Sequence, residues 1–125
     1  MYAVGDRFDA AKLIPFDDAP MALVIWVRSS CRYCTESMGF YRQLIASERS
    51  VRVVMMGVER QGVLQKYASD HQFEPDAIVS GEGAGVRLSA TPVLLLVDRS
   101  GIIRSIWRGQ LRQTGDQQKV LDSLR

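Results

Sequence analysis

The chain has 125 residues, of which 46% are hydrophobic and 24% are charged, and its formal net charge is +2. This length fits one domain with a single sizeable core, and the composition is that of a globular protein rather than a disordered or fibrous one. The arginines are scattered and the net charge is low, so nucleic acid and membrane surfaces are not expected as main partners. We therefore expect one domain over residues 1–125.

No segment has the length of a transmembrane helix. The longest apolar run, from Met21 to Val27, is about a third of the roughly 20 residues that cross a bilayer. The first residues, "MYAVGDRF", lack the basic start, apolar middle and cleavage site of a secretory signal. Two locations stay open: the cytoplasm, or an exported protein whose leader is absent from this sequence. Any membrane contact is expected only through such a leader.

The first predicted unit is a strand followed by a helix. The segment "MALVIWVR" is β-branched and aromatic without alternation, which predicts a strand buried on both faces. Apolar residues then recur at helical spacing from Arg32 to about Ser47, which predicts a helix with Ser30 as its N-cap. Cys31 and Cys34 therefore lie at a strand-to-helix junction.

The middle of the chain repeats this alternation. The segment "VRVVMMGVE" predicts a second buried strand, "GVLQKYASDHQF" a second helix, and Ala77 to Val79 a short strand. Strands that alternate with helices indicate βαβ units and a sheet with parallel pairs. The glycine-rich "SGEGAG" that follows lacks the context of a dinucleotide site and predicts a flexible loop.

The last third predicts a hairpin and a closing helix. In "TPVLLLVDRSGIIRSIWRG" two apolar runs flank Asp98-Arg99-Ser100-Gly101, whose ends suit a tight turn. The segment "TGDQQKVLDSLR" predicts a helix with Thr114 as its N-cap. Trp26, on the first strand, is expected in the core.

The chain has two cysteines, in a C-x-x-C pattern. A structural zinc site needs about four ligands, and His71, the single histidine, lies far away in sequence. Haem attachment needs a histidine directly after the second cysteine, where Thr35 stands. A disulfide between residues this close would restrict the unfolded chain little. The pattern therefore favours a redox pair over a metal site, a haem site or a structural staple, and no metal or cofactor is expected.

The spacing of the cysteines suits thiol-disulfide exchange. This chemistry needs one exposed thiolate and a second thiol close enough to release the partner from the mixed disulfide. On the first turn of a helix Cys31 would point outward as the nucleophile and Cys34 inward as the resolving thiol. The helix N-terminus favours a nearby anion, which lowers the pKa of a thiol, and Arg28 and Arg32 would add to this effect if they lie near the sulfur.

Three features resemble the thioredoxin superfamily and, within it, the TlpA/ResA-like thiol-disulfide oxidoreductases. They are the apolar strand that runs into Cys31-Arg-Tyr-Cys34, the pair Thr91-Pro92 at the start of a strand, and "TPVLLLVDRSGIIRSIWRGQ" with its Asp-x-x-Gly turn. The resemblance extends from about Val4 to Leu124. It implies an α/β thioredoxin fold: a central mixed sheet flanked by helices, with an inserted element between the second strand and the cis-proline strand.

The resemblance also implies roles for residues near the cysteines. Pro92 is expected in the cis form, which costs little for proline alone, with its loop facing the C-x-x-C. Thr91 and Pro92 are expected to bind substrate. Arg32 and Tyr33, which stand between the cysteines, are expected to bind it as well.

Several positions depart from the family's pattern. The family has tryptophan before the first cysteine, proline before the second, a kinking proline five residues after the second, a buried acid six residues before the first, and glutamate three residues after the second. In that order, this chain has Ser30, Tyr33, Gly39, Ile25 and Ser37. The usual proton acceptor for Cys34 is therefore missing, and Glu36 is the best candidate.

The resemblance and the thiol pattern together predict a thiol-disulfide oxidoreductase. It would reduce or exchange disulfides in partner proteins through a mixed disulfide on Cys31, resolved by Cys34. Its partners would be protein thiols and disulfides and an upstream electron donor or acceptor. A cationic Arg32 beside the thiolate would stabilise the reduced form and make the pair more oxidising, but the direction of electron flow stays open.

Two other functions remain as alternatives. A thiol peroxidase is disfavoured because the peroxiredoxin pattern needs threonine at the position of Arg28. A thioredoxin-like adaptor with a vestigial redox pair is compatible with the altered positions Ser30, Tyr33 and Ser37. From the resemblance alone we expect a periplasmic or otherwise exported protein, with the cytoplasm as the alternative.

Overall fold

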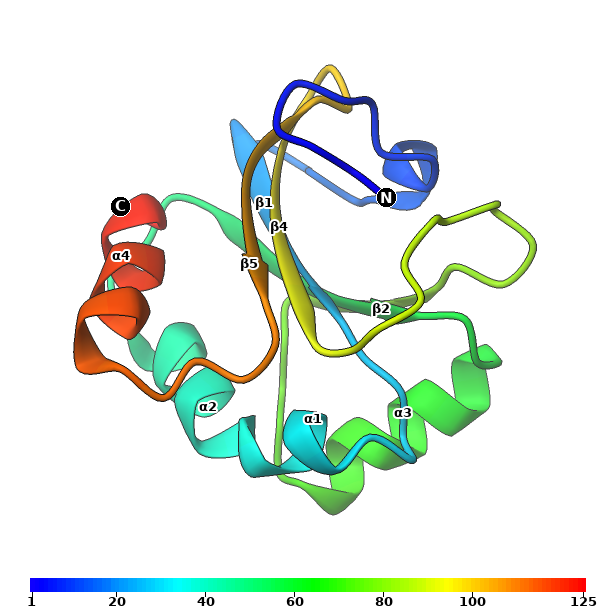
Figure 1. Cartoon of the computed structure of the whole chain (residues 1–125), viewed down its shortest axis with the longest axis vertical. Helices are drawn as coiled ribbons and strands as arrows, with labels where there is room; N and C mark the ends of the chain where they lie inside the picture. Colours follow the sequence, from blue (N-terminus) through cyan, green and yellow to red (C-terminus); the bar gives the residue numbers. More distant parts are fainter.

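The centre of the computed structural model, which describes residues 1–125, is a five-stranded sheet in the order β3-β2-β1-β4-β5 (Figure 1). Strands β1, β2 and β3 are parallel, whereas β4 runs antiparallel to both β1 and β5. The strands are β1 (Met21–Trp26), β2 (Arg52–Gly57), β3 (Ala77–Ser80), β4 (Val93–Asp98) and β5 (Ile103–Arg108). The predicted mixed sheet, with its parallel pairs and terminal hairpin, is confirmed.

Strand β1 lies in the middle of the sheet, and both of its faces are buried. Leu23 and Ile25 belong to one hydrophobic cluster, whereas Val24 and Trp26 belong to a second cluster on the opposite face. All four side chains are fully buried. This explains why the sequence of β1 shows no alternation between apolar and polar residues.

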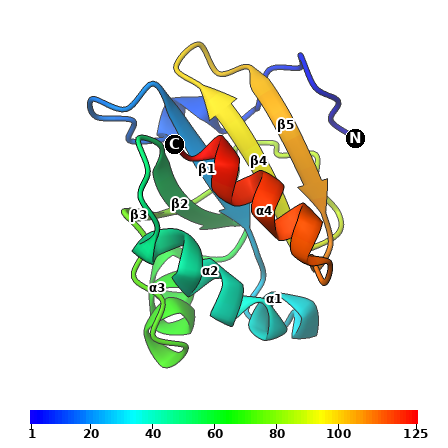
Figure 2. The same ribbon diagram turned by 90° about the vertical axis from the view of Figure 1, so that its left-hand side faces the viewer.

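Four helices contribute to the first cluster. They are α1 (Arg32–Glu36), α2 (Met38–Ala46), α3 (Gln61–Asp70) and α4 (Thr114–Ser123). Their buried side chains include Cys34, Leu44, Leu64 and Val120. Figure 2 shows α4 lying along the sheet and α1, α2 and α3 together at its lower end.

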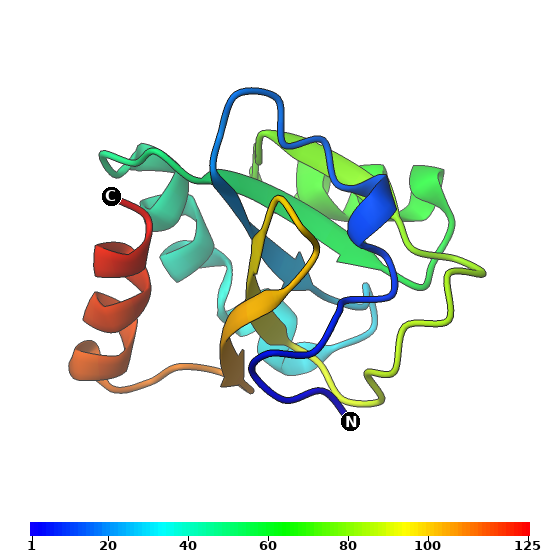
Figure 3. The same cartoon turned by 90° about the horizontal axis from the view of Figure 1, so that it is seen from above.

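The second cluster is covered mostly by chain without regular structure. Tyr2, Phe8 and Ile14 of the N-terminal segment and Leu88 of the loop after β3 supply this cover, and the single-turn helix η1 (Ala11–Leu13) is the one helical element in it. The rings of Phe8 and Trp26 meet edge to face, with centroids 6.4 Å apart. Figure 3 shows the N-terminal segment and this loop on the same side of the sheet. Burial of Trp26, as predicted, is confirmed.

The expected insertion between the second strand and the cis-proline strand is present. Strand β3 and the loop 81–92 lie between α3 and β4, and β3 extends the sheet by one parallel strand. Gly81 begins the loop directly above Trp26: an added Cβ would lie 2.8 Å from the indole ring. Only glycine fits this close approach without a shift of the ring.

The predicted helix from Arg32 to Ser47 is divided in two at Ser37. The Ser37 hydroxyl donates to the carbonyl oxygen of Tyr33 at 2.7 Å, and the Ser37 N–H is shared between the carbonyls of Tyr33 and Cys34, both at 3.1 Å. A serine that bonds back to the preceding turn bends a helix. The bend therefore comes from Ser37 rather than from a proline.

The predicted helix caps are each displaced by one residue. Cys31, not Ser30, is the N-cap of α1, because its sulfur accepts a hydrogen bond from the backbone N–H of Cys34. Gln113, not Thr114, is the N-cap of α4, and its side chain makes no capping hydrogen bond. At Cys31 a cysteine sulfur therefore takes the capping place of the expected serine hydroxyl.

Candidate active site

Cys31 and Cys34 lie just beyond the carboxyl end of β1 and have opposite environments. Cys31 has an extended backbone conformation, with φ −85° and ψ 114°, and its side chain is partly exposed. Cys34, one helical turn later, is fully buried and belongs to the core beneath α1. Both thiols are free. The predicted arrangement, with one sulfur outward and one inward, is the observed one.

The loop before β4 faces the outer cysteine. The Thr91-Pro92 peptide bond is cis, and the antiparallel register of β1 and β4 pairs Trp26 with Val93. This pairing brings the loop beside the end of β1, opposite α1 (Figure 1). The Cys31 thiol donates a weak hydrogen bond to the Thr91 carbonyl oxygen at 3.5 Å. The Cys31 sulfur thus lies between the start of α1 and a backbone carbonyl of this loop.

The surroundings of Cys31 favour its ionised form. Burial by itself would raise the pKa of Cys31, but hydrogen bonds from the Cys34 thiol and from the backbone N–H groups of Cys34 and Tyr33 stabilise the thiolate. The Cys34 N–H lies 3.1 Å from the Cys31 sulfur. The pKa of Cys31 is therefore lower than that of an ordinary thiol.

The surroundings of Cys34 favour its protonated form. Burial, together with the hydrogen bond to the Cys31 sulfur, raises the pKa of Cys34 to about 12. Of the two thiols Cys31 is therefore the one that ionises first, while Cys34 keeps its proton. Burial and hydrogen bonding alone distinguish the two thiols.

Two tyrosines lie on the buried side of the pair. Tyr41 and Tyr67 belong to the same core cluster as Cys34, and the Tyr67 hydroxyl is 2.8 Å from the Thr35 hydroxyl. Burial, together with the nearby charge of Cys34, raises the pKa of Tyr67 to about 12. Burial likewise raises the pKa of Tyr41. The buried side of the pair therefore carries protonated phenols and no carboxylate that is hydrogen-bonded to Cys34.

Sequence reasoning missed a clamp between Ser29 and Glu59. The Glu59 carboxylate accepts hydrogen bonds from the Ser29 N–H at 2.7 Å and from the Ser29 hydroxyl at 2.5 Å. Glu59 follows β2, and the carboxyl ends of the parallel strands β1 and β2 lie at the same edge of the sheet. The clamp therefore fixes the segment that leads into Cys31. An acid directly after a buried strand was the available signal.

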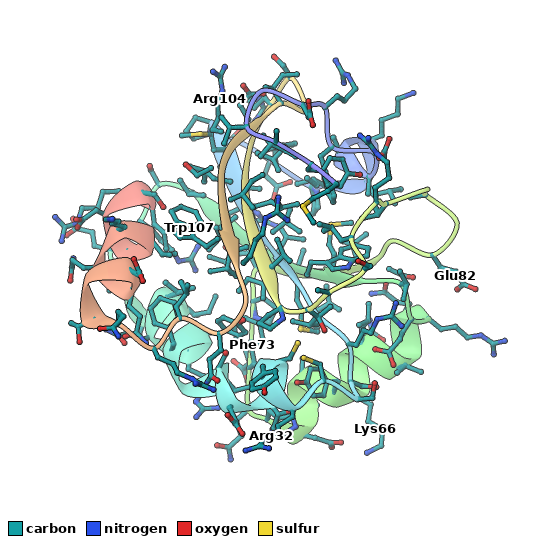
Figure 4. The ribbon with its side chains drawn as sticks, viewed as in Figure 1. Arg32, Lys66, Phe73, Glu82, Arg104 and Trp107 are labelled. Atoms are coloured by element: carbon teal, nitrogen blue, oxygen red, sulfur yellow. The ribbon has the colours of Figure 1, made fainter.

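Glu36, the predicted proton acceptor for Cys34, lies on the surface. Its carboxylate pairs with the Arg32 guanidinium at 2.7 Å, and this hydrogen bond holds the pKa of Glu36 below its ordinary value. No hydrogen bond joins Glu36 to Cys34, and Arg32 projects from the outer side of α1 (Figure 4). The structure thus brings Glu36 to Arg32 rather than to the buried thiol.

Tyr33 is exposed beside the outer cysteine. It is 46% exposed, and its ring lies between two guanidinium groups, those of Arg32 at 6.0 Å and of Arg112 at 5.8 Å. Arg28 is exposed as well, and its backbone carbonyl accepts the Cys31 N–H at 3.1 Å. Neither Arg28 nor Arg32 has a hydrogen bond to the Cys31 sulfur; the low pKa of Cys31 comes from the contacts described above.

The structure offers no cluster of metal ligands: His, Cys, Asp and Glu side chains nowhere gather in a group of three or more that could hold an ion. None of its helices has both the length and the apolar character needed to span a bilayer.

Comparison with known proteins gives similarity in structure but not in sequence. No protein-family model matches the chain, and no curated protein does. It is similar to StoA from Bacillus subtilis, with a TM-score of 0.65, 16% identity and 85% of each chain covered. A thioredoxin domain of a thiol-disulfide oxidoreductase from Bacteroides vulgatus gives a TM-score of 0.69 at 13% identity, with 100% of each chain covered.

A third solved structure leads to the same result. A secreted disulfide oxidoreductase from Mycobacterium tuberculosis gives a TM-score of 0.63 at 13% identity, with 98% of this chain and 96% of that one covered. The mixed sheet, the C-x-x-C at the start of α1 and the cis proline before β4 all fit one architecture. The chain has the thioredoxin fold, as the resemblance in its sequence predicts.

Proposed function

We propose that this protein is a thiol-disulfide oxidoreductase that reduces or exchanges disulfides in partner proteins. One observation carries the proposal: Cys31 is accessible with a lowered pKa, whereas Cys34, one turn away, is buried with a pKa raised to about 12. Neither a structural disulfide nor a vestigial pair requires its two cysteines to differ in exposure and pKa. Thiol-disulfide exchange depends on it, because the thiolate is the form that attacks.

The reaction proceeds in two exchanges. The Cys31 thiolate attacks one sulfur of a partner disulfide, the partner's other sulfur leaves as a thiolate, and a mixed disulfide forms on Cys31. Cys34 then loses its proton and attacks the Cys31 sulfur, and the second partner sulfur leaves as a thiolate that takes up a proton. Two electrons have passed to the partner, and a Cys31–Cys34 disulfide remains. An upstream dithiol donor restores the thiols; the reverse sequence oxidises a partner dithiol.

Thr91, Pro92, Arg32 and Tyr33 are the residues that we propose contact the partner. Support comes from their positions: the Thr91 carbonyl lies against the Cys31 sulfur, and Arg32 and Tyr33 are exposed beside it. The acceptor of the Cys34 proton stays a prediction. Glu36 would first have to leave Arg32.

We also propose that the protein acts outside the cytoplasm, with the cytoplasm as the alternative. The resemblance to TlpA-like proteins supports this location, and the similar protein from Mycobacterium tuberculosis is described as secreted. Its partners would be protein thiols and disulfides in that compartment, together with the upstream donor or acceptor.

The test is trapping with Cys34→Ser in both compartments of the source cell. The variant should accumulate mixed disulfides on Cys31 that a reductant releases, whereas Cys31→Ser should trap nothing. The wild type should also reduce insulin at a rate above that of the reductant alone. Partner binding without insulin turnover would favour the adaptor, and faster consumption of hydrogen peroxide than of disulfides would favour the peroxidase.

A further inference from the structure

Two adjoining hollows are lined by neighbours of Cys31: Thr91, whose carbonyl contacts its sulfur, and Tyr33. The first, about 330 Å³, lies along Thr91 and Pro92 and reaches Met1. The second, about 440 Å³, lies between Tyr33 and the segment 110–113. Arg108 and Gly109, at the end of β5, line both hollows, so the two adjoin there. One contains the cis-proline loop, and the other contains a residue that stands between the two cysteines. We call the two hollows together the cis-proline groove.

The cis-proline groove carries uncompensated positive charge. Arg108 and Arg112 both line it, and neither is among the ion pairs of the molecule. Arg108 donates to the Tyr2 carbonyl at 2.6 Å and Arg112 donates to the Gln110 side chain at 3.2 Å, so each has only neutral partners. Asp116 is the one carboxylate that lines either hollow.

The nearby charges do not cancel this excess. Arg87, at the far end of the groove, is already paired with Asp9 at 3.1 Å, and Glu36 is already held by Arg32 at 2.7 Å. Neither Arg108 nor Arg112 has a carboxylate within ion-pair distance. Guanidinium groups bind carboxylates through two parallel hydrogen bonds, which gives direction as well as attraction.

We propose that the cis-proline groove selects partner segments that are extended and acidic on either side of the reacting cysteine. Arg108 and Arg112 pair with the carboxylates of such a segment while its sulfur reaches Cys31. Opposite charge speeds the encounter, and like charge disfavours basic segments. This inference rests on the proposed function, since it names the class of substrate that the Cys31 thiolate attacks.

The test uses the reduced full-length protein and three peptides, each closed by one internal disulfide. The peptides are identical except that the two residues flanking one cysteine are Asp, Asn or Lys. Reduction of each peptide in a single turnover is followed after an acid quench. At low salt we expect the Asp peptide to react about tenfold faster than the Lys peptide, with the Asn peptide between them. About 0.5 M salt should shrink this range, because exposed charges are screened.

Variants then locate the preference. The Arg108→Gln/Arg112→Gln protein should lose about threefold or more in the rate ratio of the Asp to the Asn peptide. The ratio is used because both rates share any change in the reactivity of Cys31. Arg112→Gln alone, which leaves the Arg108 bond to Tyr2 intact, should give part of the loss. Lys119→Gln removes the same charge from an exposed position on α4 outside both hollows and should leave the ratio unchanged.

The outcomes separate this inference from the function on which it rests. If the wild type reduces none of the peptides, the oxidoreductase proposal fails. If it reduces all three at equal rates, the oxidoreductase proposal stands and the acidic preference is refuted. A preference that survives in the double variant would place the selecting charges outside the cis-proline groove and overturn the assignment to Arg108 and Arg112.

Discussion

The outer and inner sides of α1 give Cys31 and Cys34 very different surroundings, although the two residues are only one helical turn apart. On the outer side Cys31 is in contact with solvent, the Thr91 carbonyl and backbone N–H groups. On the inner side Cys34 is buried among apolar and phenolic side chains. One helical turn is enough to put two identical thiols into environments that shift their pKa values in opposite directions. The chemical asymmetry of the pair is a property of position, not of residue type.

Alkylation of the folded protein gives the largest expected difference between the two sides. Near neutral pH iodoacetamide should modify Cys31 faster than Cys34 by on the order of a hundredfold or more, because the thiolate reacts and Cys34 is both protonated and buried. Mass spectrometry of the digested protein measures both sites. In denaturant the two rates should converge, and equal rates in the folded protein would contradict the asymmetry.

The pH dependence of stability sharpens the same comparison. The pKa of Cys34 is raised in the folded protein, so its thiol stabilises the fold at pH values below the ordinary thiol pKa. This contribution is lost as the pH rises from there toward about 12. From about pH 8.5 to about pH 10 the free energy of unfolding of the reduced protein should fall by ~1–2 kcal/mol. The lowered pKa of Cys31 has the opposite sign, and its contribution is complete above the ordinary thiol pKa.

Urea unfolding under a non-thiol reductant measures this loss. Cys34→Ala should remove most of it, whereas Cys31→Ala, a change of the same size one turn away, should retain it. If the loss is the same in both variants, the buried tyrosines or other groups cause it, and the inner environment of Cys34 is not its source.

The two sides also differ in how far the sequence predicts them. The division between Cys31 and Cys34 depends on spacing along one helix, and Trp26 depends on a local apolar run, so both could be predicted. The bend at Ser37 could not, because it depends on whether that hydroxyl bonds to the Tyr33 carbonyl rather than to solvent. A local sequence pattern predicts which face of a helix or strand a side chain occupies. It does not predict which of several possible hydrogen-bond partners that side chain takes.

Most of the other features that the sequence does not predict are contacts between segments far apart in the chain. Ser29 and Glu59 are 30 positions apart, and the two hollows of the cis-proline groove join the loop before β4 to the segment after β5. Neither the clamp nor the groove is marked by a sequence motif. Both depend on which strands are neighbours in the sheet, and only the structure gives that order.

Removal of the Ser29–Glu59 clamp should act on the outer side alone. Glu59→Ala leaves the Ser29 N–H without its acceptor and should lower the free energy of unfolding by about 1–2 kcal/mol. Ser29→Ala removes only the hydroxyl bond and should cost less. Both variants should slow the alkylation of Cys31, because the segment that leads to it is released, and leave Cys34 protected. A clamp variant that exposes Cys34 instead would show that the two sides are not independent.

Substitution of Glu36 should give the smallest effect, and it decides the role of that residue. Glu36 lies on the outer side, held by Arg32, whereas the proton to be removed lies on the inner side with Cys34. Glu36→Gln should therefore leave the release of a preformed mixed disulfide within about twofold of the wild-type rate at each pH. Arg32→Gln, which frees Glu36 while keeping its carboxylate, is the matched variant. A tenfold slower release in Glu36→Gln alone, with a changed pH profile, would identify Glu36 as the proton acceptor and require that it leave Arg32 during the reaction.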